Sequence, residues 1–210
     1  MATFSLVHGS WHGGWCWDLV RAELEARGHV VHAPDLPCED IAAGVEDYAA
    51  TVPTADVVVG HSLGGYTIPL VEARTHVFLT AGVAGTGGGA LVQGFGESQV
   101  RDELGRSYYP DPAMAAAELQ YPAELTELAS KLRRQAPLAT ELLEAVAVES
   151  LVYVVCTRDA VIRPEWQRWA ARDFLGIELL ELEAGHSPML ECPSELADML
   201  DQAARRSSST

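Results

Sequence analysis

Short apolar runs alternate with helix-periodic stretches along most of this chain, and no other feature restricts its fold as strongly. The runs that read as buried strands lie at residues 4–7, 30–33, 57–59, 77–80, 151–156 and 177–182. Helical periodicity is found at residues 17–26, 40–51, 64–74, 164–174 and 193–204, and Gly, Pro or Asp marks most boundaries. This order predicts an α/β fold, with a mostly parallel six-stranded sheet and helices on both of its faces.

The alternation is interrupted once, between about residues 84 and 149. This segment begins with the glycine-rich run Gly85–Gly89 and has helix-like patterns at residues 112–119, 123–134 and 139–148. An all-helical insertion between two strands commonly serves as a lid over an active site, and the glycines would act as its hinge. We therefore expect one domain over residues 1–210 with a short helical lid at about 84–149. A plain surface crossover is the alternative.

Charge and cysteine usage narrow the class of protein. The chain has 14 basic and 30 acidic residues, a formal net charge of −16. A surface this anionic repels phosphate backbones and anionic lipids, so we expect a small-molecule substrate, no nucleic acid and no membrane partner. The four cysteines form no CxxC pair and the first residues lack a secretory signal, which predicts a cytoplasmic protein with reduced thiols. The sequence leaves a homodimer open.

The strongest local motif is Gly60-His61-Ser62-Leu63-Gly64-Gly65, which follows the apolar run 57–59. A serine is presented at a sharp strand-to-helix turn only where the flanking positions are nearly free of side chains. Gly60 and Gly64 satisfy this requirement. The motif predicts Ser62 as a nucleophile, with an incidental serine in a glycine-rich turn as the alternative.

A nucleophilic serine needs a base, and the base needs a group that orients it. Asp159 follows the apolar run 151–156, and His186 follows the run 177–182. Catalytic groups of open parallel sheets gather beyond the carboxyl ends of the strands, where both residues fall. The order Ser62, Asp159, His186 therefore predicts a catalytic triad.

The loop after the first strand, residues 8–15, is expected to complete the site. A tetrahedral oxyanion needs two backbone donors, and the amides of Ser10 and Leu63 are our candidates. His8 and His12 have the i, i+4 spacing of metal ligands, but glycines break the segment and no metal is expected. Neither is a cofactor, since no GxGxxG fingerprint is present. Candidates for the substrate pocket, for which ordinary packing is the alternative, are Gly9, Trp11, Tyr66, Tyr108, Tyr109 and Met114.

Taken together, these motifs resemble the α/β-hydrolase superfamily, and within it the branch of small methylesterases and hydroxynitrile-lyase-like proteins. The resemblance implies an α/β-hydrolase fold, Ser62 as nucleophile, His186 as general base and acid, and Asp159 as its orienter. It also implies that no metal or organic cofactor is needed. The chain departs from the branch because only 24 residues separate Asp35 from Gly60, so we carry over no substrate preference from the plant enzymes. The motifs that carry the resemblance are residues 6–17, 28–31, 35–36, 60–65, 156–159 and 184–190.

The expected function is that of a serine hydrolase of a small carboxylic ester, thioester or lactone, acting through an acyl-enzyme. Two alternatives keep the same fold: a biosynthetic cyclase or lyase that uses the triad for proton transfer, and a ligand-binding receptor. Hydroxynitrile lyases typically carry a threonine where Gly9 stands and a lysine where Ser187 stands. The resemblance therefore disfavours cyanogenic cleavage.

Overall fold

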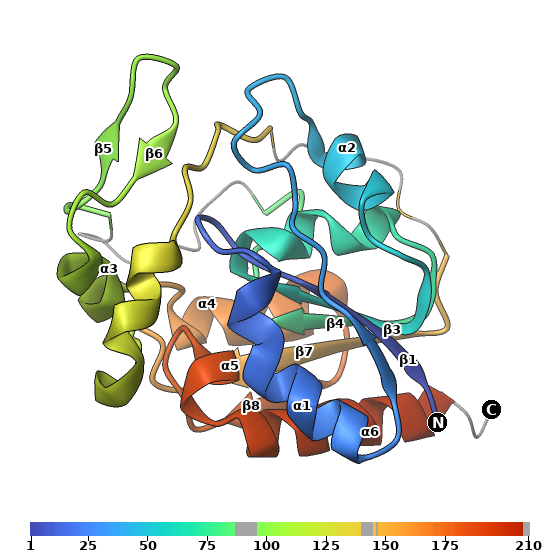
Figure 1. Cartoon of the computed structure of the whole chain (residues 1–210). Helices are drawn as coiled ribbons and strands as arrows, with labels where there is room; N and C mark the ends of the chain where they lie inside the picture. Colours follow the sequence, from blue (N-terminus) through green and yellow to red (C-terminus); the bar gives the residue numbers. More distant parts are fainter. Residues whose placement is uncertain (87–95, 140–144, 146, 208–210) are drawn as a thin grey trace.

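The computed structural model describes residues 1–86, 96–139, 145 and 147–207, and its main sheet has the strand order β2-β1-β3-β4-β7-β8 (Figure 1). Every neighbouring pair in this sheet is parallel. The α/β class and the six-stranded parallel sheet predicted from the sequence are confirmed. The strands are β1 (Thr3–Val7), β2 (Val30–His32), β3 (Ala55–His61), β4 (Ala73–Leu79), β7 (Ser150–Cys156) and β8 (Leu179–Leu182).

The strand registers bring the carboxyl ends of the strands to one edge of the sheet. Val7 at the end of β1 pairs with Gly60 of β3, and His61 at the end of β3 pairs with Leu79 at the end of β4. The last residues of β7 and β8 also pair with each other. The loops that follow these strands therefore meet at this edge, where open parallel sheets place their ligands.

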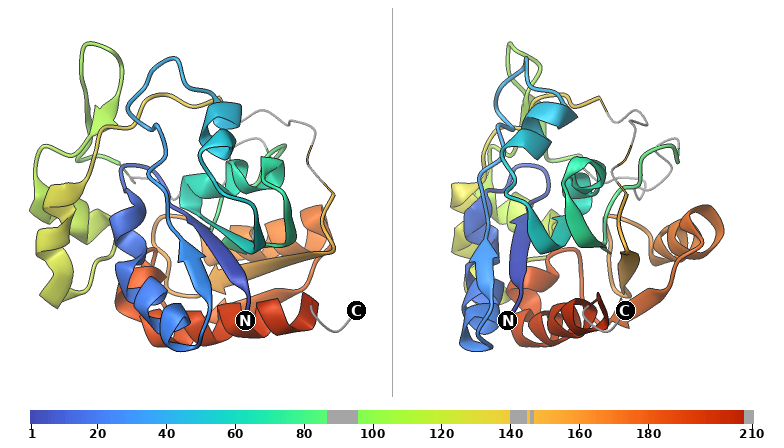
Figure 2. Two further views of the ribbon diagram at one scale, coloured as in Figure 1. Left: turned by 45° about the vertical axis from the view of Figure 1, so that its right-hand side comes forward. Right: turned by 90° about the vertical axis from the view of Figure 1, so that its right-hand side faces the viewer.

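Helices cover both faces of the sheet (Figures 1 and 2). On one face, α1 (Asp18–Ala26) and α6 (Pro193–Ser207) bury apolar stripes in one core cluster. On the other face, α2 (Val45–Ala50), α4 (Pro164–Trp169) and the π-helical turn η5 (Ala170–Leu175) pack into a second cluster. The short helices η1 (Gly14–Trp17) and α5 (Pro188–Glu191) precede α1 and α6. Among the described residues, no helix is both long and apolar enough to span a bilayer.

The prediction of a helix at residues 64–74 is wrong. Two short 3₁₀ turns, η2 (Ser62–Tyr66) and η3 (Ile68–Leu70), stand there instead, and β4 already begins at Ala73. Gly64 and Gly65 are weak helix formers, and Pro69 lacks the amide that a continuing helix needs. The connection between β3 and β4 therefore consists of two short turns and not of a long helix.

We call residues 84–149, which lie between β4 and β7, the β4–β7 segment, and it differs from the all-helical insertion expected from the sequence. It contains an antiparallel pair, β5 (Val100–Arg101) and β6 (Ser107–Tyr108), before α3 (Pro112–Glu118) and the 3₁₀ helix η4 (Ala123–Lys131). The pair forms because Gly105 adopts a φ of 77° and the Asp102 carboxylate accepts bonds from the amides of Leu104 and Arg106. Residues 87–89 of the expected hinge and most of the expected helix at 139–148 lie outside the described residues.

Candidate active site

Ser62 follows β3 directly and begins η2 at a sharp turn. Its φ is 51°, a left-handed conformation that is rare for a residue with a side chain. A Cβ at Gly60 would lie 2.7 Å from the carbonyl oxygen of Gly64, and a Cβ at Gly64 would lie 2.8 Å from that of Val7. Both glycines are therefore required by close backbone contacts, and the turn they allow exposes the serine at the sheet edge.

Ser62, His186 and Asp159 form one hydrogen-bonded chain. The Nε2 of His186 lies 3.1 Å from Ser62 Oγ, and its Nδ1 lies 2.9 Å from Asp159 Oδ2. His186 is 2% exposed and Asp159 5%. Since a carboxylate only accepts hydrogen bonds, Nδ1 carries the proton and the Nε2 lone pair faces the serine hydroxyl. This is the arrangement in which an imidazole removes a proton from a serine.

The Asp159 carboxylate is held in its ionised form. Burial alone would raise its pKa, but the neighbouring His186 and several hydrogen bonds lower the pKa below its ordinary value. Its Oδ1 accepts bonds from the amides of Val161 (2.6 Å) and Ile162 (2.9 Å). A charged Asp159 can therefore orient His186 and stabilise its protonated form.

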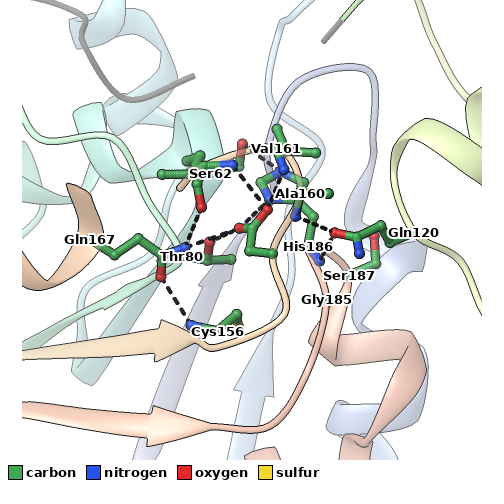
Figure 3. A network of polar contacts seen from close by, with 12 residues as sticks. Ser62, Thr80, Gln120, Cys156, Ala160, Val161, Gln167, Gly185, His186 and Ser187 are labelled. Carbon is green, nitrogen blue, oxygen red and sulfur yellow. Dashed lines mark hydrogen bonds and ion pairs between the residues drawn. The ribbon is translucent and has the colours of Figure 1, made fainter. Parts of the chain in front are cut away.

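Two further residues hold Asp159 that the sequence analysis did not single out (Figure 3). The Thr80 hydroxyl donates to Asp159 Oδ2, and so does the Gln167 amide at 3.2 Å. Gln167 also accepts a bond from the amide of Cys156, the last residue of β7, at 3.0 Å. A polar residue at the end of the apolar run 77–80 was the signal for Thr80, whereas Gln167 lies inside a helical pattern that gives no signal.

The loop after β1 lies directly against Ser62. A Cβ at Gly9 would lie 2.8 Å from Ser62 Cβ, so only a glycine lets the backbone approach this closely. Trp11 adopts a φ of 62°, which turns the chain just after Ser10. The amide of Leu63 belongs to the first turn of η2, where helical N–H groups have no partner within the helix. Both candidate oxyanion donors thus belong to segments next to Ser62.

His8 and His12 brace this loop as neutral rings. The Nε2 of His8 accepts a bond from the amide of Leu36 at 3.0 Å, and the Nε2 of His12 accepts one from the Tyr121 hydroxyl at 2.7 Å. The Nδ1 of each ring donates to a backbone carbonyl in the loop. Burial lowers the pKa of His8 to about 4 and that of His12 to about 3. Within the described part of the chain, no group of three or more His, Cys, Asp or Glu side chains could hold a metal ion.

His61 connects the turn at Ser62 to the loop of the catalytic histidine candidate. Its Nε2 donates to the carbonyl oxygen of His186 at 2.8 Å, and burial places its pKa well below the ordinary value. Its Nδ1 is buried without a hydrogen-bond partner. We assign His61 a positional role.

Three of the pocket candidates, Trp11, Tyr66 and Tyr109, pack close to one another or belong to the turn at Ser62, which we call the elbow. The Trp11 ring meets the Tyr109 ring edge to face, with centroids 5.3 Å apart, and its Nε1 donates to Ser107 Oγ at 3.0 Å. The Tyr66 ring covers Gly82, where a Cβ would come within 2.5 Å of it. Trp11 and Tyr109 therefore join the loop after β1 to the β4–β7 segment.

The other two pocket candidates with side chains point elsewhere. The Tyr108 ring lies under the guanidinium of Arg134, 4.7 Å from its centroid, and Met114 is 49% exposed in the first turn of α3. Among the described residues, no hydrogen bond, ion pair or ring contact joins Tyr108 or Met114 to Ser62 or His186.

Comparison with known proteins identifies the family of this chain. The chain belongs to the alpha/beta hydrolase family, whose model matches residues 6–199. Within that family it lies in the methylesterase-like branch, and it is an esterase-like enzyme. Methylesterase 9 of Arabidopsis thaliana is 30% identical to it, over 95% of this chain and 97% of the relative.

Two solved structures share the fold at lower identity. A pyrethroid hydrolase from Sphingobium faniae is 22% identical, with a TM-score of 0.77 over 97% of each chain. Tomato methylketone synthase I, solved with 2-tridecanone, is 23% identical, with a TM-score of 0.76 over 97% of this chain and 98% of the other. At this level of identity the two structures show the architecture, and the chemistry must be argued from the site.

Proposed function

We propose that the protein is a serine esterase that hydrolyses small carboxylic esters through an acyl-enzyme on Ser62. The observation that carries this proposal is the hydrogen-bonded chain from Ser62 through His186 to Asp159 at the carboxyl edge of the sheet. Relatives named methylesterases support an ester of a small alcohol as the substrate. Thioesters and lactones undergo the same acyl transfer, so we include them among the proposed substrates.

In the first half of the proposed reaction, His186 Nε2 takes the proton of Ser62 as its Oγ attacks the ester carbonyl carbon. The ionised Asp159 stabilises the imidazolium that results. The carbonyl oxygen becomes an oxyanion, for which the amides of Ser10 and Leu63 are the proposed donors. The imidazolium then protonates the leaving alcohol, and the acyl group remains on Ser62.

The second half repeats these steps with water. His186 removes a proton from a water molecule, whose oxygen attacks the acyl carbon, and the proton then returns to Ser62 as the acid leaves. Every proton in this scheme moves through His186, so the proposed reaction needs no metal or organic cofactor.

We further propose that the chain is one domain in which the β4–β7 segment forms a lid, with Trp11 and Tyr109 in the wall of the pocket.

Cyanogenic lyase chemistry fits this site poorly. A threonine in place of Gly9 would bring its Cβ within 2.8 Å of Ser62 Cβ, so the backbone would have to move. Ser187, where lyases of this branch carry a lysine, is fully buried and donates to the carbonyl of Leu119 at 2.7 Å. Neither position therefore favours stabilisation of a leaving cyanide.

A comparison of wild type with Ser62→Ala tests the proposal. We expect wild type to hydrolyse short-chain aryl esters and to be labelled by a fluorophosphonate probe, both in the presence of EDTA. Ser62→Ala should lose about 10⁶-fold in turnover and all labelling, as triad serines do. The matched control is Ser130→Ala, because Ser130 is exposed and, within the described part of the chain, its hydroxyl bonds only to a carbonyl of η4. Hydrolysis that survives in Ser62→Ala, or is lost with EDTA, would contradict the mechanism. Tight binding without turnover or labelling would instead favour a receptor.

A further inference from the structure

Gln120 stands out among the residues of the β4–β7 segment because it touches the loops of two triad members. It follows α3 and adopts a φ of 55°, a left-handed conformation that side chains disfavour. It is separated from Arg158 by 38 residues and from His186 by 66. No sequence motif links it to them.

The side-chain amide of Gln120 bonds to the backbone of the residues before and after Asp159 and to the backbone of His186. Figure 3 shows Gln120 together with Ala160 and His186. Its Oε1 accepts bonds from the amides of Ala160 (2.8 Å) and His186 (3.0 Å), and its Nε2 donates to the carbonyl of Arg158 (3.0 Å). Two donors on one side and an acceptor on the other fix which way the amide points. One planar group therefore joins the loop after β7 to the loop after β8.

The packing around Gln120 fits the same role. A Cβ at Gly185 would lie 3.0 Å from the Gln120 amide, so the chain just before His186 runs directly against it. On the other side of His186, the Ser187 hydroxyl donates to the carbonyl of Leu119 at 2.7 Å. Gln120 thus bonds to His186, and the neighbouring Leu119 bonds to Ser187.

We propose that Gln120 is a positioning residue for catalysis: it holds the Asp159 and His186 loops at the separation that lets His186 bond both Asp159 and Ser62. This inference rests on the function proposed above. Thr80 and Gln167 fix the Asp159 carboxylate from the sheet side. Gln120 acts from the opposite side, on backbone groups, and fixes the position of one loop relative to the other.

Gln120 is only partly buried, so its removal leaves backbone groups that water can reach and the variants should fold. Gln120→Met keeps the length of the side chain and its contact with Gly185 but removes all three hydrogen bonds. Gln120→Glu retains an oxygen that can accept both bonds, but its second oxygen faces the carbonyl of Arg158 and cannot donate to it. Ser130→Ala, in η4 of the same segment, is the control without a bond to either loop.

We expect Gln120→Met to lower kcat for a short aryl ester by about 10- to 100-fold, since a displacement of about 1 Å is sufficient for such a loss. KM should change by less than about threefold, because the loops concerned place the triad and not the substrate. The fluorophosphonate should label Ser62 more slowly by a similar factor as kcat. Gln120→Glu should recover most of both losses.

The pH profile separates positioning from simple stabilisation. In Gln120→Met the acidic limb of kcat/KM should move to lower pH, because a misaligned Asp159 stabilises protonated His186 less well. The titratable groups that face His186 are Asp159, His61 and His12, and all three are unchanged in the variant. Wild-type kcat and an unmoved profile in Gln120→Met would overturn the inference, as would no recovery in Gln120→Glu. Activity in Ser62→Ala would instead overturn the proposed function, so the two failures are distinguishable.

Discussion

The sheet edge and the β4–β7 segment contribute to the site by different physical means. At the sheet edge, the strand registers and tight backbone contacts place Ser62, Asp159 and His186. The β4–β7 segment reaches the same loops through side chains, with Gln120 bonded to the Asp159 and His186 loops and Tyr121 bonded to His12. The sheet edge is thus positioned by topology, whereas the segment depends on individual hydrogen bonds.

The two regions also differ in the burial of some of their residues. Asp159 and His186 are almost fully buried, whereas the β4–β7 segment buries one side, including Ala115 and Leu119, and exposes Met114 and several residues of η4. A buried site excludes water from the charged groups and strengthens their interactions, whereas exposed loops tolerate sequence change. We therefore expect substitutions at the sheet edge to affect chemistry on every substrate, and substitutions in the segment to affect alignment or selectivity.

Asp159→Asn should lower kcat/KM by roughly 10⁴-fold for every ester, because the amide side chain favours the wrong tautomer of His186. Steady-state kinetics on short and long acyl esters, together with the rate of fluorophosphonate labelling, measure this loss. Asp173→Asn, an exposed carboxylate in η5, is the control and should be unaffected. A loss below tenfold, or one confined to some esters, would contradict the proposed difference between the sheet edge and the β4–β7 segment. Asp159 would then not contribute to the reactivity of Ser62.

Stability should fall as the pH is lowered from about 6.5, because His8 and His12 are neutral in the folded state. Burial lowers their pKa values to about 4 and about 3, from an ordinary value of 6.5. Between those limits the unfolded chain binds more protons than the folded one, so the free energy of unfolding increases with pH. At pH 5 each histidine should account for a loss of about 2 kcal/mol relative to pH 7.5.

Urea unfolding of wild type, His8→Asn and His12→Asn at pH 7.5 and 5.0 measures this loss. Each substitution should reduce the difference between the two pH values by about 2 kcal/mol. His8 is held by the backbone of residues near the sheet, whereas His12 is capped by Tyr121 of the β4–β7 segment. A reduction in His8→Asn alone would show that the segment no longer shields His12 at pH 5. No reduction in either variant would contradict the assignment of neutral rings.

What could be predicted from the sequence follows the same division. The alternation of strands and helices predicted the parallel sheet, which is confirmed. Parallel strands align their carboxyl ends, and this explains why Ser62, Asp159 and His186, which follow three different strands, lie together in the structure. The turn between β5 and β6 was missed, since Asp102 and Gly105 form it within a stretch that lacks strand periodicity. The interruption after Ser62 was missed because an apolar pattern outweighed Gly64, Gly65 and Pro69 in the interpretation.

Gln120 and Gln167 illustrate why the rest could not be predicted. Gln120 acts through hydrogen bonds to backbone groups, and Gln167 combines such a bond with a bond to the Asp159 carboxylate. Every residue has a backbone, so the identity of a residue does not indicate which side chain its backbone bonds. The partners of Gln120 are also 38 to 66 residues away, so no local spacing rule applies. Such residues become visible only when the loops are placed in space.

The smallest expected effect concerns selectivity, and Tyr109 is the residue best placed to reveal it. Its ring packs edge to face on Trp11, which follows the proposed oxyanion donor Ser10. Tyr109→Ala should change the ratio of kcat/KM between short and bulky acyl esters by about tenfold, the usual effect of removing part of an apolar wall. Labelling of Ser62 by a small phosphonate should change by less than about threefold, because the elbow itself is untouched. Tyr108→Ala is the matched control, since that ring lies under Arg134 instead. If Tyr109→Ala lowers labelling and every ester by the same factor, the β4–β7 segment stabilises the elbow and does not select among substrates.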